Sequence, residues 1–193
     1  MYKLGIIIPF LNNSKQADDL WKILKKNLEK QIDEHRNDVF AVVCYDDIEN
    51  PKGLSHQRNQ GIDKIINYCN YILFLDADDD IDNDFIEKML KKTETKAEML
   101  ESRFMIRDYE LPFEPNVLKN HVTGIAYRTD IIGDNRFDEN IKFGEDKEFV
   151  ERIIDISKMK KEFVDTTYHY NYGANPECMT YRWSRGELRG DKE

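Results

Sequence analysis

The sequence is poor in cysteine and has no cysteine pair spaced for a metal site. Its three cysteines, an odd number, are Cys44, Cys69 and Cys178, and none of them forms a C-x-x-C motif. Free cysteines outside such motifs usually pack as small apolar side chains. Cysteine usage therefore indicates a reducing compartment.

Long apolar runs are also missing. The opening segment LGIIIPFL is short, is interrupted by Pro9 and shows no cleavage pattern of a signal peptide. No run approaches the roughly 20 apolar residues that a membrane-spanning helix needs. We therefore expect a cytoplasmic protein without a transmembrane segment.

Positive charge is in deficit. The chain has 38 Asp and Glu residues against 29 Lys and Arg residues, a formal net charge of −9. This balance argues against nucleic acid as the main partner. It leaves an anionic substrate open, because a bound cation can invert the local field. A length of 193 residues, 40% of them hydrophobic, suits one domain with a real core.

The first half alternates strand and helix patterns. Compact apolar runs predict three strands, over Lys3–Phe10, Val39–Asp47 and Tyr71–Leu75. Apolar spacings of three and four predict the helices that follow them, over 14–28, 54–69 and 85–90. Right-handed crossovers then place the strands in parallel, with helices on the faces of the sheet. The predicted fold class is α/β, with a mostly parallel sheet flanked by helices.

The second half is less regular and predicts a smaller, mixed C-terminal part. The patterns favour a strand over 97–110, a strand leading into a short helix over 122–132, a helix over 145–156 and an aromatic strand over 162–173. We expect a single domain over residues 1–193, with a regular half over 1–95 and a mixed half over 96–193.

The most unusual stretch is YILFLDADDDIDNDFIE, in which seven carboxylates follow an apolar strand between Asp76 and Glu87. Ligands of α/β sheets bind at the carboxyl ends of the strands, where Asp76 and Asp78 lie together with Asp46 and Asp47. Unpaired charge at the end of a buried strand is costly. We therefore expect a positive partner for this acidic run.

Two interpretations of the acidic run involve no substrate. Its acids match an EF-hand calcium loop in number, but Ile81 stands where that loop needs glycine, and a strand precedes it instead of a helix. Alternatively, the run is a solvated turn in which Asp82 and Asp84 cap the next helix, where its dipole favours carboxylates. The capping interpretation leaves Asp76 and Asp78 unexplained.

A third interpretation is a site for Mg²⁺ or Mn²⁺, both of which prefer carboxylate oxygens. Magnesium usually takes one or two carboxylates and completes its shell with water and phosphate oxygens. A D-x-D pair after a strand provides such ligands, and the ion would hold a diphosphate against a negative protein. The motif alone is not specific, so its surroundings decide.

Those surroundings resemble family 2 glycosyltransferases of the GT-A fold. The resemblance covers residues 4 to 156 and rests on five segments in order, LGIIIPFLNN, VVCYDD, GLSHQRNQGI, YILFLDADDDI and TGIAYRTDIIGDNRFDENIKFGEDKEFVERI. It implies a metal-dependent, inverting transfer of sugar from a nucleoside-diphosphate sugar, such as a UDP-sugar, to a carbohydrate or other hydroxyl acceptor. Residues 1–95 would bind the nucleotide, and 96–193 would supply the acceptor site and the base.

The resemblance also implies roles for single residues in nucleotide binding. Pro9 and Phe10 would shape the loop under the nucleotide, and Arg58 would lie near it. Either Asp46 or Asp47 would accept hydrogen bonds from the nucleobase.

Further roles concern the metal and the chemistry. Asp76 would face the ribose or the metal, Asp78 would be the main metal ligand, and Asp79 would support them. Asp146 would be the catalytic base, with Glu145 beside it. His169 is a further candidate for the metal or diphosphate, or simply a strand histidine between two tyrosines.

Two other functions remain open. A nucleotidyltransferase shares the sheet and the metal carboxylates, but it favours a glycine-rich loop after the first strand, and PFLNNSKQ contains no glycine. A degenerate module that binds a nucleotide or glycan without turnover is the other alternative. The sequence also departs from the family pattern: His56 and Gln57 stand where small residues are common, and YDDIEN replaces the usual Gly-Ser turn. These departures concern the identity of the donor sugar and the acceptor more than the fold.

Overall fold

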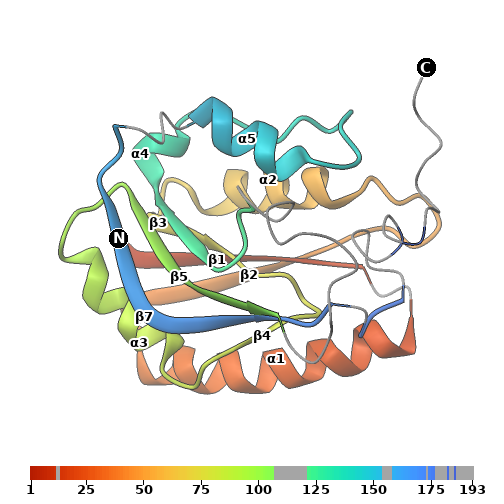
Figure 1. Cartoon of the computed structure of the whole chain (residues 1–193), viewed down its shortest axis with the longest axis horizontal. Helices are drawn as coiled ribbons and strands as arrows, with labels where there is room; N and C mark the ends of the chain where they lie inside the picture. The colour runs from red at the N-terminus through yellow and green to blue at the C-terminus, as the bar shows by residue number, and fades with distance from the viewer. Residues whose placement is uncertain are drawn as a thin grey trace.

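The computed structural model describes residues 1–11, 14–106, 121–153, 158–172, 174–176, 182 and 185. Its strands are β1 (Tyr2–Phe10), β2 (Val39–Tyr45), β3 (Cys69–Phe74), β4 (Asp80–Ile81), β5 (Met99–Ile106), β6 (Ile125–Arg128) and β7 (Lys161–Tyr170). Its helices are α1 (Lys15–Glu34), α2 (Leu54–Ile65), α3 (Phe85–Thr93), α4 (Thr129–Ile132) and α5 (Glu145–Ile153). Together they form the α/β architecture that the sequence predicts (Figure 1).

The strands form one seven-stranded sheet in the order β2-β1-β3-β6-β5-β7-β4. β1 pairs in parallel with β2 and β3, which confirms the predicted arrangement of the first three strands. The rest of the sheet is mixed: β6 is antiparallel to β3 and β5, β7 is parallel to β5, and β4 is antiparallel to β7. The carboxyl ends of β1, β2 and β3 therefore share one edge of the sheet.

Helices cover both faces of this sheet. Figure 1 shows α1 and α3 on one side and α2, α4 and α5 on the other. The buried apolar side chains form two clusters that correspond to these two layers. Strands covered on both faces need no polar alternation, which explains why β1 and β3 are apolar almost throughout.

Helix α1 begins as the sequence predicts. The Ser14 side chain accepts a hydrogen bond from the backbone N–H of Ala17 at 3.0 Å, the arrangement of an N-cap. Near the other end of α1, buried Gln31 accepts a hydrogen bond from the Ile86 N–H at 2.9 Å. This bond satisfies a donor in the first turn of α3, where helical N–H groups lack intrahelical partners. α1 thus fixes the helix that follows the acidic run.

Helix α2 approaches β1 closely at Gly61. A Cβ atom at this position would lie 2.4 Å from Cγ2 of Ile7, a distance that no packed side chain could keep. The glycine is therefore explained by packing, and the close approach brings Arg58, one turn earlier, against the sheet.

The predicted helix over 54–69 is too long. α2 ends at Ile65, and Cys69 begins β3, with its Sγ donating to the Ile65 carbonyl oxygen at 3.3 Å. Periodicity misses this boundary because a cysteine buried at a strand start fits the same apolar spacing. Residues 107–110 of the predicted strand and 154–156 of the predicted helix lie outside the described residues.

The acidic run folds into a turn, the short strand β4 and the start of α3. Residues 80 and 81 pair with β7, so the backbone does not form the EF-hand loop. Different partners contact the individual acids: Arg58 for Asp76, Asn175 for Asp78, Tyr168 for Asp79, Asn27 for Asp80, His169 for Asp82 and Lys88 for Asp84. The crowding of carboxylates is thus relieved by several partners rather than one.

The predicted position of Asp84 at a helix start is confirmed, because Asp84 is the N-cap residue of α3, but its side chain makes no capping hydrogen bond there. That side chain accepts a hydrogen bond from Thr166 at 3.1 Å. The Asp82 carboxylate accepts from the Thr167 N–H at 2.8 Å. Both acids therefore attach the run to β7, which the sequence places more than eighty residues later.

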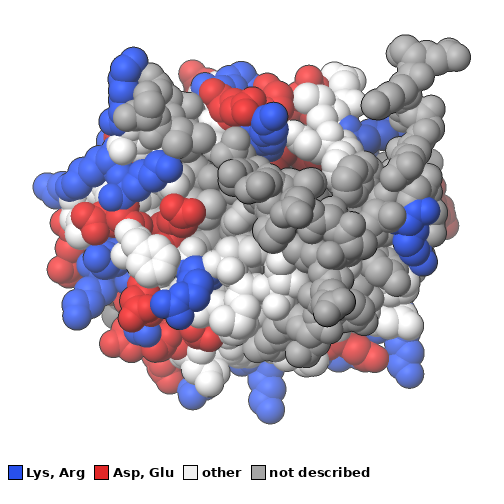
Figure 2. Space-filling model, viewed as in Figure 1, with Lys and Arg blue, Asp and Glu red and all other residues white. Residues whose placement is uncertain are grey.

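The surface carries charge of both signs. Figure 2 shows Lys and Arg interspersed with Asp and Glu at the left of the view. Ion pairs such as Arg103 with Asp165, at 3.1 Å, reflect this mixture. Among the helices that the structure describes, none combines the length and apolar character needed to cross a bilayer.

Candidate active site

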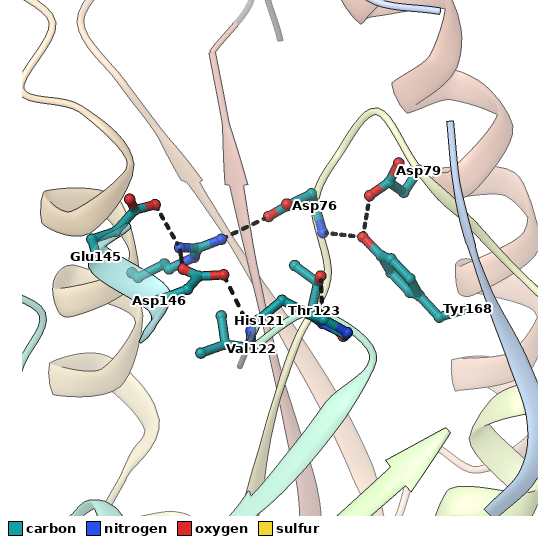
Figure 3. Close-up of polar contacts among 9 residues, drawn as sticks. Asp76, Asp79, His121, Val122, Thr123, Glu145, Asp146 and Tyr168 are labelled. Carbon is teal, nitrogen blue, oxygen red and sulfur yellow. Dashed lines mark hydrogen bonds and ion pairs between the residues drawn. The ribbon is translucent and has the colours of Figure 1, made fainter. Parts of the chain in front are cut away.

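Arg58 on α2 gathers three carboxylates at the carboxyl edge of the sheet. Its Nη2 lies 3.2 Å from Asp76, and its Nη1 lies 3.3 Å from Glu145 and also bonds to Asp146. Figure 3 shows Asp76 on one side of this cluster and the two acids of α5 on the other. The arginine side chain is only 1% exposed, so this is a buried ionic cluster with more negative than positive groups.

Burial sets the proton affinities in the cluster. It raises the pKa of Glu145 to about 7, the charge of Asp146 adds to the shift, and Arg58 opposes it. Burial likewise raises the pKa of Asp76 to about 6, again against the effect of Arg58. Burial alone would lower the pKa of Arg58, but the charges of the three carboxylates outweigh it and raise that pKa above its ordinary value. The guanidinium therefore stays charged.

Asp146 is held by both carboxylate oxygens. Oδ1 bonds to Arg58, and Oδ2 accepts from the backbone N–H of Val122 at 3.1 Å. Asp146 also lies in the first turn of α5, where the helix dipole favours negative charge. The sequence places this residue correctly at a helix start, and the contacts fix its orientation.

The turn after β3 is supported from β7. The Tyr168 hydroxyl bonds to the Asp79 carboxylate and accepts from the Asp76 N–H at 3.4 Å (Figure 3). The second oxygen of Asp79 accepts from the Asn171 N–H at 2.8 Å. Burial raises the pKa of Asp79 well above its ordinary value, and the charges of Asp78 and Asp76 add to this.

Asp78 is half-buried beside this turn. Its Oδ2 accepts from the Asn175 side-chain amide at 2.9 Å, and burial raises its pKa although that hydrogen bond opposes the shift. Across the part of the chain that the structure describes, no three His, Cys, Asp or Glu side chains are arranged to hold a metal ion. Asp76 and Asp78 nevertheless suit Mg²⁺ or Mn²⁺, because such ions need only one or two protein carboxylates when a diphosphate supplies further oxygens.

His169 is not brought together with these two acids. Its Nε2 lies 2.7 Å from Oδ1 of Asp82. Neighbouring residues of a strand point to opposite faces, and Tyr168 already points toward Asp76 and Asp79. The role of His169 as a metal or diphosphate ligand stays a prediction.

The predicted nucleobase acids shape their own loop. Asp46 accepts backbone hydrogen bonds from Asp47 and Lys52, both at 3.0 Å, and from Gly53 at 2.8 Å. Burial works to raise the pKa of Asp46, but these hydrogen bonds outweigh it and hold the pKa below its ordinary value. Asp47 accepts from the Glu49 N–H at 2.9 Å. Both acids thus order the segment between β2 and α2.

Pro9 and Phe10 are buried at the carboxyl end of β1, next to β2. The Phe10 ring lies 5.6 Å from the Trp21 ring and 5.7 Å from that of Tyr45. These two residues therefore lie beside the end of β2, directly before the loop that begins at Asp46. Their contact with a nucleotide stays a prediction.

Sequence reasoning misses several residues that build the site. Tyr168 and Asn171 come from β7 and the turn after it, where the only sequence signal is the aromatic strand pattern. His121 is also missed: its Nδ1 lies 3.0 Å from the Thr123 carbonyl oxygen, its ring is 4.3 Å from that of Phe104, and burial lowers its pKa. No motif marks this histidine.

Comparison with known families identifies the chain. Residues 10–176 match the sequence model of the family described as Glycosyl transferase family 2. The chain belongs to this family. The family prediction made from the sequence is thereby confirmed. Among curated proteins, none matches the chain.

Solved structures of glycosyltransferases share the fold. S. aureus TarS 1–349 matches with a TM-score of 0.64 at 16% identity, over 88% of this chain and 60% of that one. The same TarS fragment in complex with UDP-GlcNAc gives a TM-score of 0.64 at 15% identity, over 88% and 58%. The catalytic domain of Drosophila beta1,4galactosyltransferase 7, in complex with xylobiose, gives 0.57 at 14% identity, over 85% and 65%. These likenesses confirm the GT-A fold.

The chain spans about 60% of the length of the TarS fragment that it matches.

Proposed function

We propose that this glycosyltransferase-family chain carries out metal-dependent, inverting transfer of a sugar from a nucleoside-diphosphate sugar to a hydroxyl acceptor. The observation that carries the proposal is the shared edge at which Asp76, after β3, and Asp146, at the start of α5, are bridged by Arg58. The cluster thus brings Asp76, a proposed metal ligand, together with Asp146, the candidate base, and the reaction needs both a bound metal and a base.

On this proposal, Asp76 and Asp78 would hold Mg²⁺ or Mn²⁺, which neutralises the charge of a leaving diphosphate. Pro9 and Phe10 would support the nucleotide, and Asp46 or Asp47 would bind its base, within a nucleotide-binding half over 1–95. A UDP-sugar is the first donor to test, because related TarS structures contain UDP-GlcNAc and UDP.

Asp146 would act as the general base within the half over 96–193. Its carboxylate is fixed by Val122 and Arg58, so it can accept the proton of an acceptor hydroxyl as that oxygen attacks the anomeric carbon. Attack from the face opposite the leaving diphosphate inverts the anomeric centre. Glu145 would lie beside the base. The proposed acceptor is a carbohydrate or another hydroxyl compound. The proposed location of the enzyme is the cytoplasm.

A donor-hydrolysis assay tests the proposal before an acceptor is known. The chain is incubated with UDP-sugars, GDP-sugars and Mn²⁺ or Mg²⁺, and release of nucleoside diphosphate is measured. We expect release that depends on the ion and on Asp78. No release with any donor, combined with tight nucleotide binding, would support the binding module instead.

The assignment of Asp146 as the base is tested by a separate variant. Asp146→Asn keeps the side-chain shape but removes the proton acceptor, so transfer should slow by about 10²-fold or more while nucleotide affinity changes little. Asp130→Asn is the matched control, since Asp130 is exposed and pairs with Arg128 at the surface. Near-normal transfer by Asp146→Asn would exclude Asp146 as the base.

A further inference from the structure

The contacts of Arg58 differ from those of an arginine that waits for a phosphate. Its side chain is 1% exposed, and its two terminal nitrogens already bond to Asp76, Glu145 and Asp146. A nucleotide could reach the guanidinium only by displacing one of these carboxylates. Nucleotide contact therefore explains its position poorly.

The three carboxylates come from distant parts of the chain. Asp76 is 18 residues from Arg58, and Asp146 is 88 residues from it. The first belongs to the end of β3 and the second to the start of α5. Arg58 therefore connects Asp76, the carboxylate proposed to face the sugar donor, with Asp146, the proposed base.

Charge explains why an arginine is needed there. The carboxylate of Glu145 is buried and those of Asp76 and Asp146 are partly buried, so the three would repel one another without a cation. Removing one partner of a buried charge pair leaves the others uncompensated. The planar guanidinium directs its donors along fixed lines and so sets distances as well as charge. A lysine at the same position would supply a single point charge.

Arg58 is itself held in place. Its guanidinium carbon lies 5.3 Å from the centre of the Phe137 ring, and Gly61 on the same helix packs against β1. Phe137 in turn stacks on Phe149 of α5 with ring centres 3.9 Å apart. Packing of Phe137 and α2 therefore holds the Arg58 side chain in place, as is required of a residue that positions a catalytic group.

We propose that Arg58 is a positioning residue. It holds Asp146 in a fixed place relative to Asp76, at the carboxyl ends of the strands where the sugar donor would bind, and it does not itself bind the nucleotide. This inference rests on the proposed function, and it replaces the sequence prediction that Arg58 is a nucleotide contact.

A double-mutant cycle tests it. Arg58→Lys, Asp146→Asn and the double variant are compared with the unmodified chain in donor hydrolysis. Misplacing a catalytic group by about 1 Å can cost roughly 10²-fold in rate, so Arg58→Lys should lower kcat by about that factor and leave the donor KM within about threefold. If Arg58 acts through Asp146, the double variant should be about as slow as Asp146→Asn alone.

Arg128→Lys is the matched control, because Arg128 is a more exposed arginine paired with Asp130 and Glu98 away from the cluster. It should leave kcat unchanged. Multiplicative losses in the double variant, or a large rise in donor KM for Arg58→Lys, would overturn the proposal while the proposed function stands. An unmodified chain without turnover would instead overturn the proposed function.

A structure of the unmodified chain with UDP and Mn²⁺ gives a second test, which does not depend on whether Arg58→Lys folds. We expect Arg58 to keep its bonds to Asp76 and Asp146, with no guanidinium nitrogen within about 3.5 Å of the nucleotide. A direct bond from Arg58 to the diphosphate or the base would refute the positioning role.

Discussion

The Tyr168 hydroxyl on β7 bonds to the carboxylate of Asp79, 89 residues earlier in the chain. Both side chains are almost completely buried, at 1% and 2% exposure. The same hydroxyl accepts from the Asp76 N–H at 3.4 Å. Strand β7 thus fixes the turn that carries Asp76 and Asp78, the proposed metal ligands. The first prediction tests this contribution of Tyr168.

Tyr168→Phe should destabilise the protein by about 1–3 kcal/mol, because it leaves a buried carboxyl oxygen without its partner. Tyr127→Phe is the matched control: within the described residues the buried Tyr127 hydroxyl has no hydrogen-bond partner, so its removal should cost little or stabilise. Urea unfolding measures both. Equal losses in the two variants would show that the Asp79 bond contributes nothing specific.

Stability should fall as the pH rises toward 8. The pKa of Glu145 is about 7 in the folded chain, against 4.5 for an unperturbed glutamate. Between these values the folded state binds more protons than the unfolded state, so the free energy of unfolding decreases with rising pH. The contribution of Glu145 is complete below about pH 4.5 and lost above about pH 7.

Glu145→Gln removes this titration. The variant should gain on the order of 1–2 kcal/mol at pH 8 relative to the unmodified chain, and gain little at pH 4.5. Glu148→Gln is a control of opposite sign, because pairing with Arg152 lowers the pKa of Glu148 and its contribution is present at high pH. Urea unfolding at several pH values measures both, and a pH-independent effect of Glu145→Gln would contradict the raised pKa.

Metal binding should depend on nucleotide. Asp76 and Asp78 provide only part of a coordination shell, so Mn²⁺ should bind weakly alone and more tightly with UDP, whose diphosphate adds oxygens. Calorimetry should show that Asp78→Ala abolishes this gain. Glu87→Gln should not, since exposed Glu87 lies on α3 beyond the turn. Equal affinity with and without UDP would contradict the site.

His169→Gln belongs in the same titrations. A loss parallel to that of Asp78→Ala would establish His169 as a ligand. Unchanged Mn²⁺ affinity with lower stability would limit its role to the bond with Asp82, at 2.7 Å.

The sequence predicts the first half of the fold well because strong local patterns decide it. β1 and β3 are apolar almost throughout, and α1 has both its N-cap at Ser14 and its apolar spacing, so local and global preferences agree. The positions of Asp76 and Asp146 follow from the same patterns together with the family resemblance. Their partners do not follow from either.

Long-range contacts are what the sequence conceals. β4 has only two residues and forms because β7 pairs with it, and Tyr168 reaches Asp79 only once that pairing exists. Arg58 looks like a ligand residue in a motif, yet its bonds to Asp76 and Asp146 need the folded sheet and α5. Such contacts depend on tertiary packing, which periodicity does not encode.

The last prediction concerns Gly61, on which the placement of Arg58 depends. Gly61→Ala puts a methyl group against Ile7, and overpacking of this kind typically costs about 1–3 kcal/mol. Lys64→Ala, on the exposed face of the same helix, should change stability by less than about 0.5 kcal/mol. Urea unfolding compares the two.

Ile7→Ala decides whether the clash is the cause. Alone, it should destabilise by about 2–5 kcal/mol, because it leaves a cavity beneath α2. In that background Gly61→Ala adds a methyl group where space now exists, so its cost should shrink or reverse, and the two substitutions should not be additive. Full additivity would mean that the cost of Gly61→Ala arises elsewhere, and that close packing on β1 does not set the position of Arg58.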